Sequence, residues 1–414
     1  MGINNQTLCA GFIFLLIIRL FTEYIDRTFQ LALTPVISAL FLPLGLLIVL
    51  AGRVFDRQVL VLGILWLCIS VSAICSAVFS PSPFASSSWS QVYKYMTYAI
   101  IPLVGYVIGG HQASKQKLAW ALICYAVLAY GFAIYEGVFE LGMTAIVDET
   151  LVRSLAFSSH PVLFGLQIYF TLGLLLYLAL EQTGLTKKQA NFFLLMALGA
   201  LFFTYARTAW LMVMLVLTAY FKEKLLRLKV IAPLLLILCA VFVGGLGQPV
   251  IDRFQDLKSL YSFVHDRQYA QQHATSFVDS SMHWRVLQWY GLIQVAKEHL
   301  VTGVGPGQVK SYNVSSRSAH SSLVEMFVEQ GLLGFLLILL FYMLCLRIAF
   351  KPANRHQRFL SVTVVLGFIA ASLFSVSLHN QTTNMMLFLL FLGLVAAGHS
   401  DAKKSGVVTN EDLQ

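Results

Sequence analysis

Long apolar runs alternate with short polar segments along most of this chain. Because a run of about 20 apolar residues can cross the hydrocarbon core as a helix, the pattern predicts an all-α polytopic membrane protein with about twelve spans. The predicted spans cover residues 8–25, 30–51, 58–80, 91–110, 117–139, 161–180, 189–204, 205–221, 229–246, 331–350, 359–377 and 383–398. The run 189–221 is too long for one upright helix and short for two, which favours tilted or partly re-entrant helices meeting near Thr204 to Thr208.

One stretch interrupts this alternation. From Gly247 to Ala319 the chain is polar, and the next helical element is predicted to begin at His320. The pattern divides the chain into spans one to nine, a large loop with amphipathic helices, spans ten to twelve and a tail, over residues 1–246, 247–330, 331–398 and 399–414.

Composition supports the membrane assignment. The chain is 58% hydrophobic and only 11% charged, whereas a soluble domain carries roughly 25% charged residues. The formal charge of +9 does not indicate a nucleic-acid partner, because most of the excess lies in short loops between spans. The expected partners of the apolar surface are membrane lipids.

Basic residues fall in alternate loops, which predicts the orientation. They are Arg53, Arg57, Lys115, Lys117, Lys187, Lys188, Lys222, Lys224, Arg227, Lys229, Lys351, Arg355, Arg358, Lys403 and Lys404. Since Lys and Arg are enriched in cytoplasmic loops, both termini are predicted to be cytoplasmic. The long loop then faces outward, toward the periplasm if the cell is Gram-negative.

The long loop nevertheless holds seven of the 28 basic residues, namely Arg253, Lys258, Arg267, Arg285, Lys297, Lys310 and Arg317. Lys and Arg are normally scarce on the outer side of the membrane. Their presence in this loop is explained more easily by an anionic ligand than by topology. Lys94, Arg153 and Arg207 are also predicted to lie on the outer side. Arg207, between two apolar runs, is either a structural arginine or a ligand for an anionic headgroup, to which guanidinium offers forked donors.

Arg285 and Trp289 are four residues apart and share one face of a predicted helix, capped by Asp279 or Ser280 and ending near His299. This amphipathic helix is predicted to lie on the outer surface. The glycines of 303–307 that follow it permit a sharp chain reversal, but the segment lacks the context of a nucleotide-binding loop.

His320 is predicted to begin a helix capped by Ser318, on one face with Leu323 and Phe327. In a basic loop at the mouth of a span, its imidazole suits a general base near neutral pH. Glu325 or Glu329 is a candidate to orient it, and the spacing does not decide between them.

Weaker signals surround these residues. His160 and Arg153 either line the same cavity or form a plain junction between loop and helix. Arg19 and Glu23, one turn apart in the first span, are predicted to form a structural ion pair. His379 and Asn380 are predicted to lie in a short outer turn.

Arginines at the outer interface favour a lipid-linked phosphate or diphosphate, and a histidine base favours activation of a hydroxyl group. The chain contains no Asp-x-Asp motif, so a metal-held diphosphate is not indicated and no metal or cofactor is expected. Arginine charges can instead stabilise a departing diphosphate.

Taken together, these motifs resemble the superfamily of O-antigen ligases (WaaL) and O-antigen polymerases (Wzy). The resemblance is carried by Arg207 in Thr-Tyr-Ala-Arg-Thr-Ala-Trp, Arg285 ahead of Trp289, the glycine turn 303–307 and His320 before Glu329-Gln-Gly. Twelve spans with a large outer loop before the tenth are similar to the architecture of that family. In place of the serine that often precedes the inter-span arginine, this chain has Ala206.

The resemblance implies a metal-independent GT-C type glycosyltransferase whose donor is a glycan linked to undecaprenyl diphosphate. It implies that Arg207, Arg285 and His320 carry the activity, and that the acceptor of a ligase is a sugar hydroxyl of the lipid A–core. Further substrate contacts are expected from Lys94, Arg153, His160, Trp289 and Glu329.

Three alternatives remain. An O-antigen polymerase would use a second lipid-linked glycan as acceptor, and often has more than one large outer loop. A protein O-oligosaccharyltransferase often has an extended outer C-terminal region. A transporter would also have about twelve spans, but no two-half repeat or buried acidic relay is evident.

Overall fold

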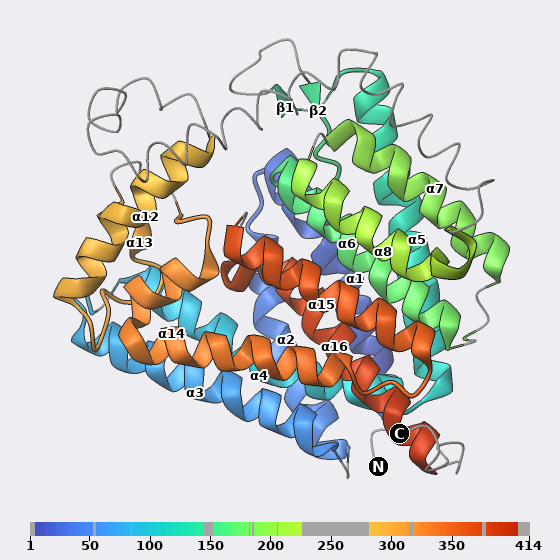
Figure 1. Ribbon diagram of the computed structural model, residues 1–414, viewed down its shortest axis with the longest axis horizontal. Coiled ribbons are helices and arrows are strands. Elements are labelled where there is room, and N and C mark those ends of the chain that lie inside the picture. The colour runs from blue at the N-terminus through green and yellow to red at the C-terminus, as the bar shows by residue number, and fades with distance from the viewer. Residues whose placement is uncertain are drawn as a thin grey trace.

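Helices form nearly all of the regular structure in the described part of the chain (Figure 1). The computed structural model describes residues 5–52, 55–83, 85–141, 143–144, 152–181, 183, 186–204, 206–225, 281–313, 318–374 and 378–404. The first eight helices are α1 (Asn5–Phe29), α2 (Leu33–Ala51), α3 (Arg57–Phe79), α4 (Ser86–Gly109), α5 (Gln112–Val138), α6 (Pro161–Leu180), α7 (Lys187–Thr204) and α8 (Arg207–Leu225). The later ones are α12 (Ser281–Glu298), α13 (Val309–Tyr312), α14 (Ser322–Ala349), α15 (Arg355–Phe374), the 3₁₀ turn η3 (Leu378–Asn380) and α16 (Thr382–Lys404).

Each predicted span except the ninth has a helix as its counterpart, and the ninth, 229–246, lies outside the described residues. Within the described ranges, seven helices are long and apolar enough to cross a membrane, and three shorter apolar helices accompany them. The chain is thus a multi-pass membrane protein, while the count of twelve spans stays a prediction. As the sequence predicted, two helices meet at 204–207.

The only strands among the described residues are β1 (Met143–Thr144) and β2 (Val152–Arg153), which pair antiparallel between α5 and α6. They place Arg153 at the end of a short hairpin. The domain boundaries stay predictions, although α16 continues to Lys404 and so extends helical structure into the predicted tail.

Contacts between loops divide the helix ends into two sets. On one side, Lys115 pairs with Glu181 at 3.2 Å and Lys351 pairs with Asp56 at 2.6 Å. These residues all belong to the predicted cytoplasmic side. The other set includes the contacts of Arg153 with Thr204, of Glu325 with Asn380 and of Gln308 with Ser87, and we call this side of the bundle the outer end. Loops that the charge pattern assigns to one side therefore contact one another.

Helix α16 passes through the middle of the bundle (Figure 1), and its side chains from Met385 to Ala397 are nearly all buried. It packs against α4 and α6. The approach to α4 is close because it uses glycines: a Cβ atom on Gly105 would lie 2.6 Å from the carbonyl oxygen of Leu390. Small residues let membrane helices pack closely in this way. Helix α2, by contrast, is buried over only 17% of its apolar window and exposes large aliphatic side chains, as expected for contact with lipid.

Candidate active site

Helix α12 carries Arg285 and Trp289 and packs against α14 (Figure 1). Leu292 and Ala296 are buried and form the inner face of this helix, which ends at Glu298, close to the predicted end near His299. The predicted capping residues lie outside the described ranges. Arg285 donates from Nη1 to the carbonyl oxygen of Phe374 at 2.8 Å. The guanidinium is therefore anchored at the last residue of α15.

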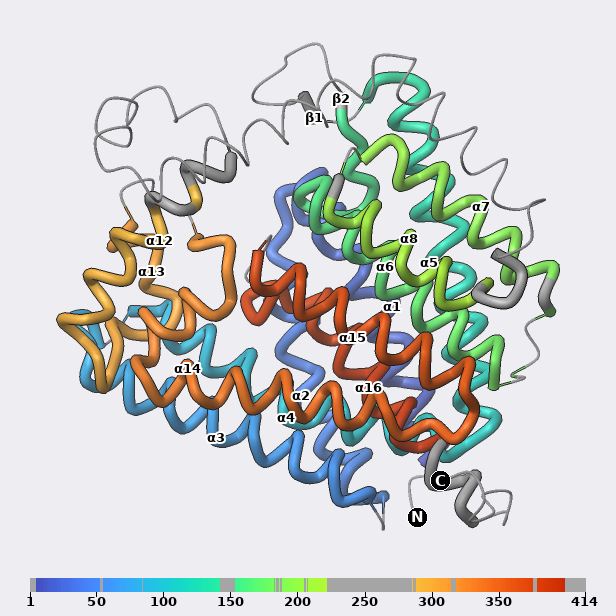
Figure 2. The backbone as a smooth tube through the Cα atoms, viewed as in Figure 1, coloured from blue at the N-terminus to red at the C-terminus, as the bar shows by residue number. Residues whose placement is uncertain are grey.

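The glycine turn then reverses the chain against α14, and Figure 2 traces this path from α12 through α13. The residues Gly303, Gly305 and Gly307 all have positive φ, at 70°, 104° and 73°. Gly305 N donates to the carbonyl oxygen of Glu329 at 3.0 Å. That carbonyl is free of the helix because Gly331, with φ 65° and ψ −158°, interrupts α14. A Cβ atom on Gly331 would lie 2.5 Å from the carbonyl oxygen of Val301, so only glycine fits there.

His320 precedes α14 instead of beginning it, which corrects the sequence prediction. The helix starts at Ser322 with Ser321, not Ser318, at the N-cap position. His320 itself has φ 55°, in the left-handed region. A non-glycine residue held there costs of order 1–3 kcal/mol and persists only where the surroundings fix it.

Those surroundings hold the neighbouring residue, Ala319, at both of its peptide groups. Trp289 Nε1 donates to the Ala319 carbonyl oxygen at 2.6 Å, and the Ala319 N–H donates to Glu325 Oε1 at 3.1 Å. The second carboxylate oxygen of Glu325 accepts from Asn380 Nδ2 at 2.8 Å. His320 thus follows a residue that α12 and α14 fix from opposite sides.

The predicted turn at His379 and Asn380 is confirmed as η3, and it is buried. His379 Nε2 lies 3.7 Å from Glu325 Oε2. Burial, together with the charge of Lys94, lowers the pKa of His379 to about 3. The imidazole is therefore neutral at neutral pH, and its contact with Glu325 is dipolar and not an ion pair.

Glu329 and Lys94 lie deeper in the same region. The Glu329 side chain is 1% exposed, and the backbone amides of Gly307 and Val309 point at its carboxylate. Lys94 Nζ donates to Gln91 Oε1 at 3.4 Å, and its charge interacts with that of Glu329. These contacts place both predicted substrate residues beside the glycine turn. Whether Glu325 or Glu329 orients the His320 ring stays a prediction.

Arg153 lies at the junction between α7 and α8. Its Nε donates to the carbonyl oxygen of Thr204, the last residue of α7, at 3.0 Å. Arg207 is the first residue of α8. The two predicted outer arginines are therefore brought to one junction, which we call the arginine elbow, residues 204–207.

A buried carboxylate fixes the loop below this elbow. Glu136, near the end of α5, accepts from Ser154 Oγ at 2.9 Å and from the N–H groups of Leu155 and Ala156 at 2.9 and 2.6 Å. Ser154 N in turn donates to the carbonyl oxygen of Phe203 at 2.8 Å. Glu136 therefore positions the loop that holds the end of α7.

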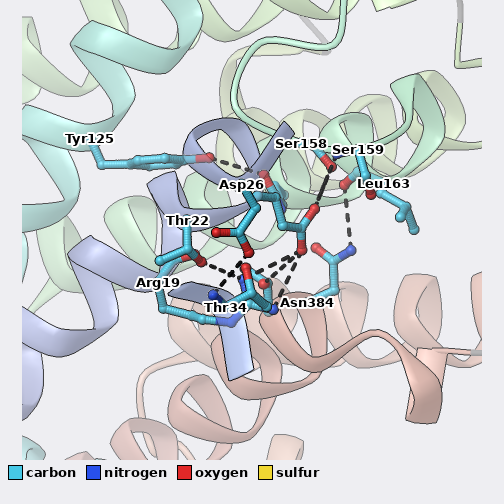
Figure 3. A network of polar contacts seen from close by, with 12 residues as sticks. Arg19, Thr22, Asp26, Thr34, Tyr125, Ser158, Ser159, Leu163 and Asn384 are labelled. Carbon is cyan, nitrogen blue, oxygen red and sulfur yellow. Dashed lines mark hydrogen bonds and ion pairs between the residues drawn. The ribbon is translucent and has the colours of Figure 1, made fainter. Parts of the chain in front are cut away.

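Figure 3 shows the polar network in which α1 joins this loop to α16. Arg19 and Glu23 form the predicted i, i+4 pair at 3.5 Å. The Glu23 carboxylate also accepts from Ser159 N at 3.1 Å and from Thr383 Oγ1 at 3.4 Å. Since Thr383 lies three residues after Asn380, the short segment 380–384 connects the Glu325 contacts with the loop beside the arginine elbow.

His160 occupies the junction between that loop and α6. Its Nδ1 accepts from Val162 N at 3.2 Å and so caps the helix, while Pro161 supplies the first residue. The imidazole is exposed to solvent at the outer end. His160 therefore caps α6, as the plain junction reading expected. Its contact with the substrate stays a prediction.

An open apolar groove of about 480 Å³ is lined by residues of α12, α14 and the end of α15. Its walls are Trp289, Ile293, Ser321, Leu323, Val324, Phe327, Phe335, Leu373 and Phe374. Phe374 is the residue whose carbonyl oxygen binds Arg285, and Ser321 follows His320 in the chain. The groove therefore has a guanidinium at one border and an imidazole-bearing loop at another.

Four other basic residues of the long loop, Arg253, Lys258, Arg267 and Arg317, lie outside the described ranges. The side chain of Arg207, the first residue of α8, also lies outside the described part of the structure. Among the described residues, no three His, Cys, Asp or Glu side chains are grouped so that they would hold a metal ion.

The fold and these contacts define a multi-pass membrane protein whose polar groups and glycine turn meet at one end of a helix bundle. Residues 192–339 match the model of a family described as O-antigen ligase. Over these residues the chain is similar to that family, which bears out the resemblance to the ligase and polymerase superfamily. A search of curated proteins finds no match to the chain. The matched residues include Arg207, Arg285, the glycine turn and His320.

Sequence reasoning missed Glu136 and assigned no role to Asn380. The sequence did contain a signal for Glu136. An ionisable residue within an apolar span costs free energy to insert in the membrane, and its presence therefore indicates a specific partner. No comparable signal marked Asn380, because its partner Glu325 is 55 residues away in the sequence.

Proposed function

We propose that this protein is an O-antigen ligase of the bacterial inner membrane. It transfers an O-antigen glycan from undecaprenyl diphosphate to a sugar hydroxyl of the lipid A–core, on the periplasmic side. The observation that carries the proposal is the family match over 192–339, which includes Arg285, Trp289 and His320.

The groove suits such a donor because its two parts differ in polarity. Leu323, Phe327 and Phe335 offer apolar contact to an isoprenoid chain. Arg285 lies at the border of the groove through its bond to Phe374. A guanidinium binds phosphate oxygens with forked, permanently charged donors. We place the diphosphate at Arg285 and Arg207, with Lys94 and Arg153 adding positive charge nearby.

In the proposed step, the acceptor hydroxyl oxygen attacks the anomeric carbon of the first donor sugar. A new glycosidic C–O bond forms as the C–O bond to the diphosphate breaks, and undecaprenyl diphosphate departs with that electron pair. His320 takes the hydroxyl proton, and the arginines stabilise the charge on the leaving group. In-line attack inverts the anomeric centre. The reaction needs no metal in this proposal.

The test uses cells that lack their own ligase but make lipid-linked O-antigen and a matching lipid A–core. Cells expressing the protein should show an O-antigen ladder on lipopolysaccharide gels, and cells expressing His320→Ala should not. Losing a general base typically costs about 10²- to 10⁴-fold in rate. A near-normal ladder with His320→Ala would remove His320 from this role.

The same gel separates the alternative functions, provided that membrane blots show equal expression. Lipid-linked polymer that accumulates without a ladder would favour the polymerase. Glycan on a periplasmic protein would favour the protein O-oligosaccharyltransferase. Either result would overturn the ligase proposal.

A further inference from the structure

Glu325 has contacts that neither the family match nor the general-base role of His320 explains. It lies in the first turn of α14, its side chain is 1% exposed, and both carboxylate oxygens are used. Oε1 accepts from the Ala319 N–H at 3.1 Å, and Oε2 accepts from Asn380 Nδ2 at 2.8 Å. Burying a carboxylate at the outer end of a membrane bundle raises the free energy of the folded protein unless such hydrogen bonds offset the loss of hydration.

The geometry points to a positioning role for this carboxylate. We propose that Glu325, held by Asn380, fixes the backbone at Ala319 so that His320 keeps its left-handed conformation and presents its imidazole to the acceptor. The inference rests on the proposed function, because it assigns a purpose to the conformation of the proposed base.

The first reason is that Ala319 is held at both peptide groups by side chains from two helices. Trp289 of α12 binds its carbonyl oxygen at 2.6 Å, opposite the Glu325 contact with its N–H. With both groups fixed, the chain direction entering His320 is fixed as well. The φ of 55° at His320 is then maintained by its surroundings although it is unfavourable for a residue with a Cβ atom.

The second reason is the origin of the contacts. Trp289 belongs to the helix that carries Arg285, and Asn380 belongs to the segment that reaches the loop beside the arginine elbow. Trp289 thus links Ala319 to the helix that carries Arg285, and Glu325 links it through the segment 380–384 to the loop beside the arginine elbow. Such a link is useful where an imidazole must be aligned with a bound diphosphate, since a misplacement of about 1 Å can cost roughly 10²-fold in rate.

The experiment is a double-mutant cycle on the purified protein in detergent, with lipid-linked glycan as donor and lipid A–core as acceptor. The four proteins are wild type, Glu325→Ala, His320→Ala and the double variant. We expect Glu325→Ala to lower kcat about 10- to 100-fold with little change in either KM, because His320 is displaced while the binding groups remain. In the His320→Ala background, the same change should have almost no further effect.

Each outcome bears on a different statement. Wild-type kcat in Glu325→Ala, or an equal loss in both backgrounds, would show that Glu325 does not act through His320 and would overturn the inference. Wild-type activity in His320→Ala would remove His320 as the general base and overturn the inference with it, whereas no transfer to the lipid A–core by the wild-type protein would defeat the proposed function. The exposed Glu298 of α12 offers a matched control, and Glu298→Ala should leave kcat and melting temperature unchanged.

If Glu325→Ala does not fold, Trp289→Phe tests the same arrangement more gently. It keeps the aromatic packing and removes only the hydrogen bond to the Ala319 carbonyl oxygen. A lower kcat with unchanged donor KM, again absent in the His320→Ala background, would support the inference. A loss confined to donor KM would place Trp289 in donor binding alone and would overturn its positioning role.

Discussion

Two loops at the outer end hold their backbones in the same manner but present different side chains. The loop 152–160 contains Ala156 with φ 44°, and the segment 318–321 contains His320 with φ 55°. In each case a buried glutamate from a neighbouring helix accepts from the loop backbone: Glu136 from two N–H groups and Glu325 from one. Glu136 serves the first loop with three hydrogen bonds, and Glu325 serves the second.

The difference lies in what the strained residue offers. Ala156 is fully buried and contributes only a methyl group, whereas His320 is half-buried and contributes an imidazole. The same arrangement therefore serves structure in one loop and, in our proposal, chemistry in the other. A left-handed non-glycine residue locates a candidate site only when its side chain is reactive and accessible.

The largest expected effect comes from substituting glycine at both strained positions. Glycine adopts positive φ readily, so the backbone strain is relieved in Ala156→Gly and in His320→Gly alike. We expect His320→Gly to lose about 10²- to 10⁴-fold in transfer rate because the base is gone. Ala156→Gly should keep its activity. Melting temperatures in detergent should be unchanged or slightly raised in both variants.

Comparing Ala156→Gly with His320→Gly separates the effect of the backbone conformation from the effect of the imidazole. Equal activity losses in the two variants would mean that the conformation of the outer loops, and not the imidazole, limits transfer. Normal activity in both would remove His320 from catalysis.

The next effect concerns Glu136, whose removal leaves several loop donors buried without partners. Each unsatisfied buried donor costs about 1–3 kcal/mol, so Glu136→Ala should lower the melting temperature clearly. Glu136→Gln keeps one carbonyl acceptor and should lower it less. Activity should fall as well, because the loop holds the end of α7 beside Arg207. Glu140→Gln, at an exposed position one turn later, is the matched control.

The glutamate variants also sharpen the comparison with Glu325. If both loops are held in the same way, Glu136→Ala should change melting temperature more than Glu325→Ala does, since Glu136 accepts more hydrogen bonds from its loop. The reverse order would show that the two arrangements are not equivalent.

Much of the fold could be predicted because apolar runs and alternating basic loops are local signals. They located every described helix except α12 and α13 at a predicted span, and the junction at 204–207 followed from the length of one run. The start of α14 was predicted wrongly for a physical reason. The spacing of His320, Leu323 and Phe327 is helical, but Trp289 and Glu325 fix Ala319 in a conformation that excludes His320 from the helix.

The candidate site was predictable only in part. Charged residues in unusual places, such as Arg207 and Arg285, are visible in the sequence. The partners that position them are not, because contacts such as Asn380 with Glu325 and Arg153 with Thr204 join segments about 50 residues apart. Tertiary packing alone brings these groups together.

The smallest expected effect is the loss of stability at low pH that His379, beside Glu325, and His160, in the loop 152–160, each cause. Burial, with the charge of Lys94, lowers the pKa of His379 to about 3 in the folded protein, against about 6.5 in an unfolded chain. Below pH 6.5 the unfolded chain therefore takes up a proton that folded His379 does not, and stability falls as the pH falls. The loss is at most about 1.4 kcal/mol per pH unit for one group.

Several groups face His379 and set this balance. Lys94 opposes its protonation, while Glu325, 3.7 Å away, would favour it, and the ring of Tyr95 packs at 6.2 Å. In the other loop, burial and then Arg153 lower the pKa of His160, but that imidazole is exposed and solvent screens the effect. His379→Gln should therefore reduce the drop in melting temperature between pH 7 and pH 5 more than His160→Asn, which retains a helix cap. A larger change from His160→Asn would place the acid-sensitive group in the loop beside the arginine elbow and not beside Glu325.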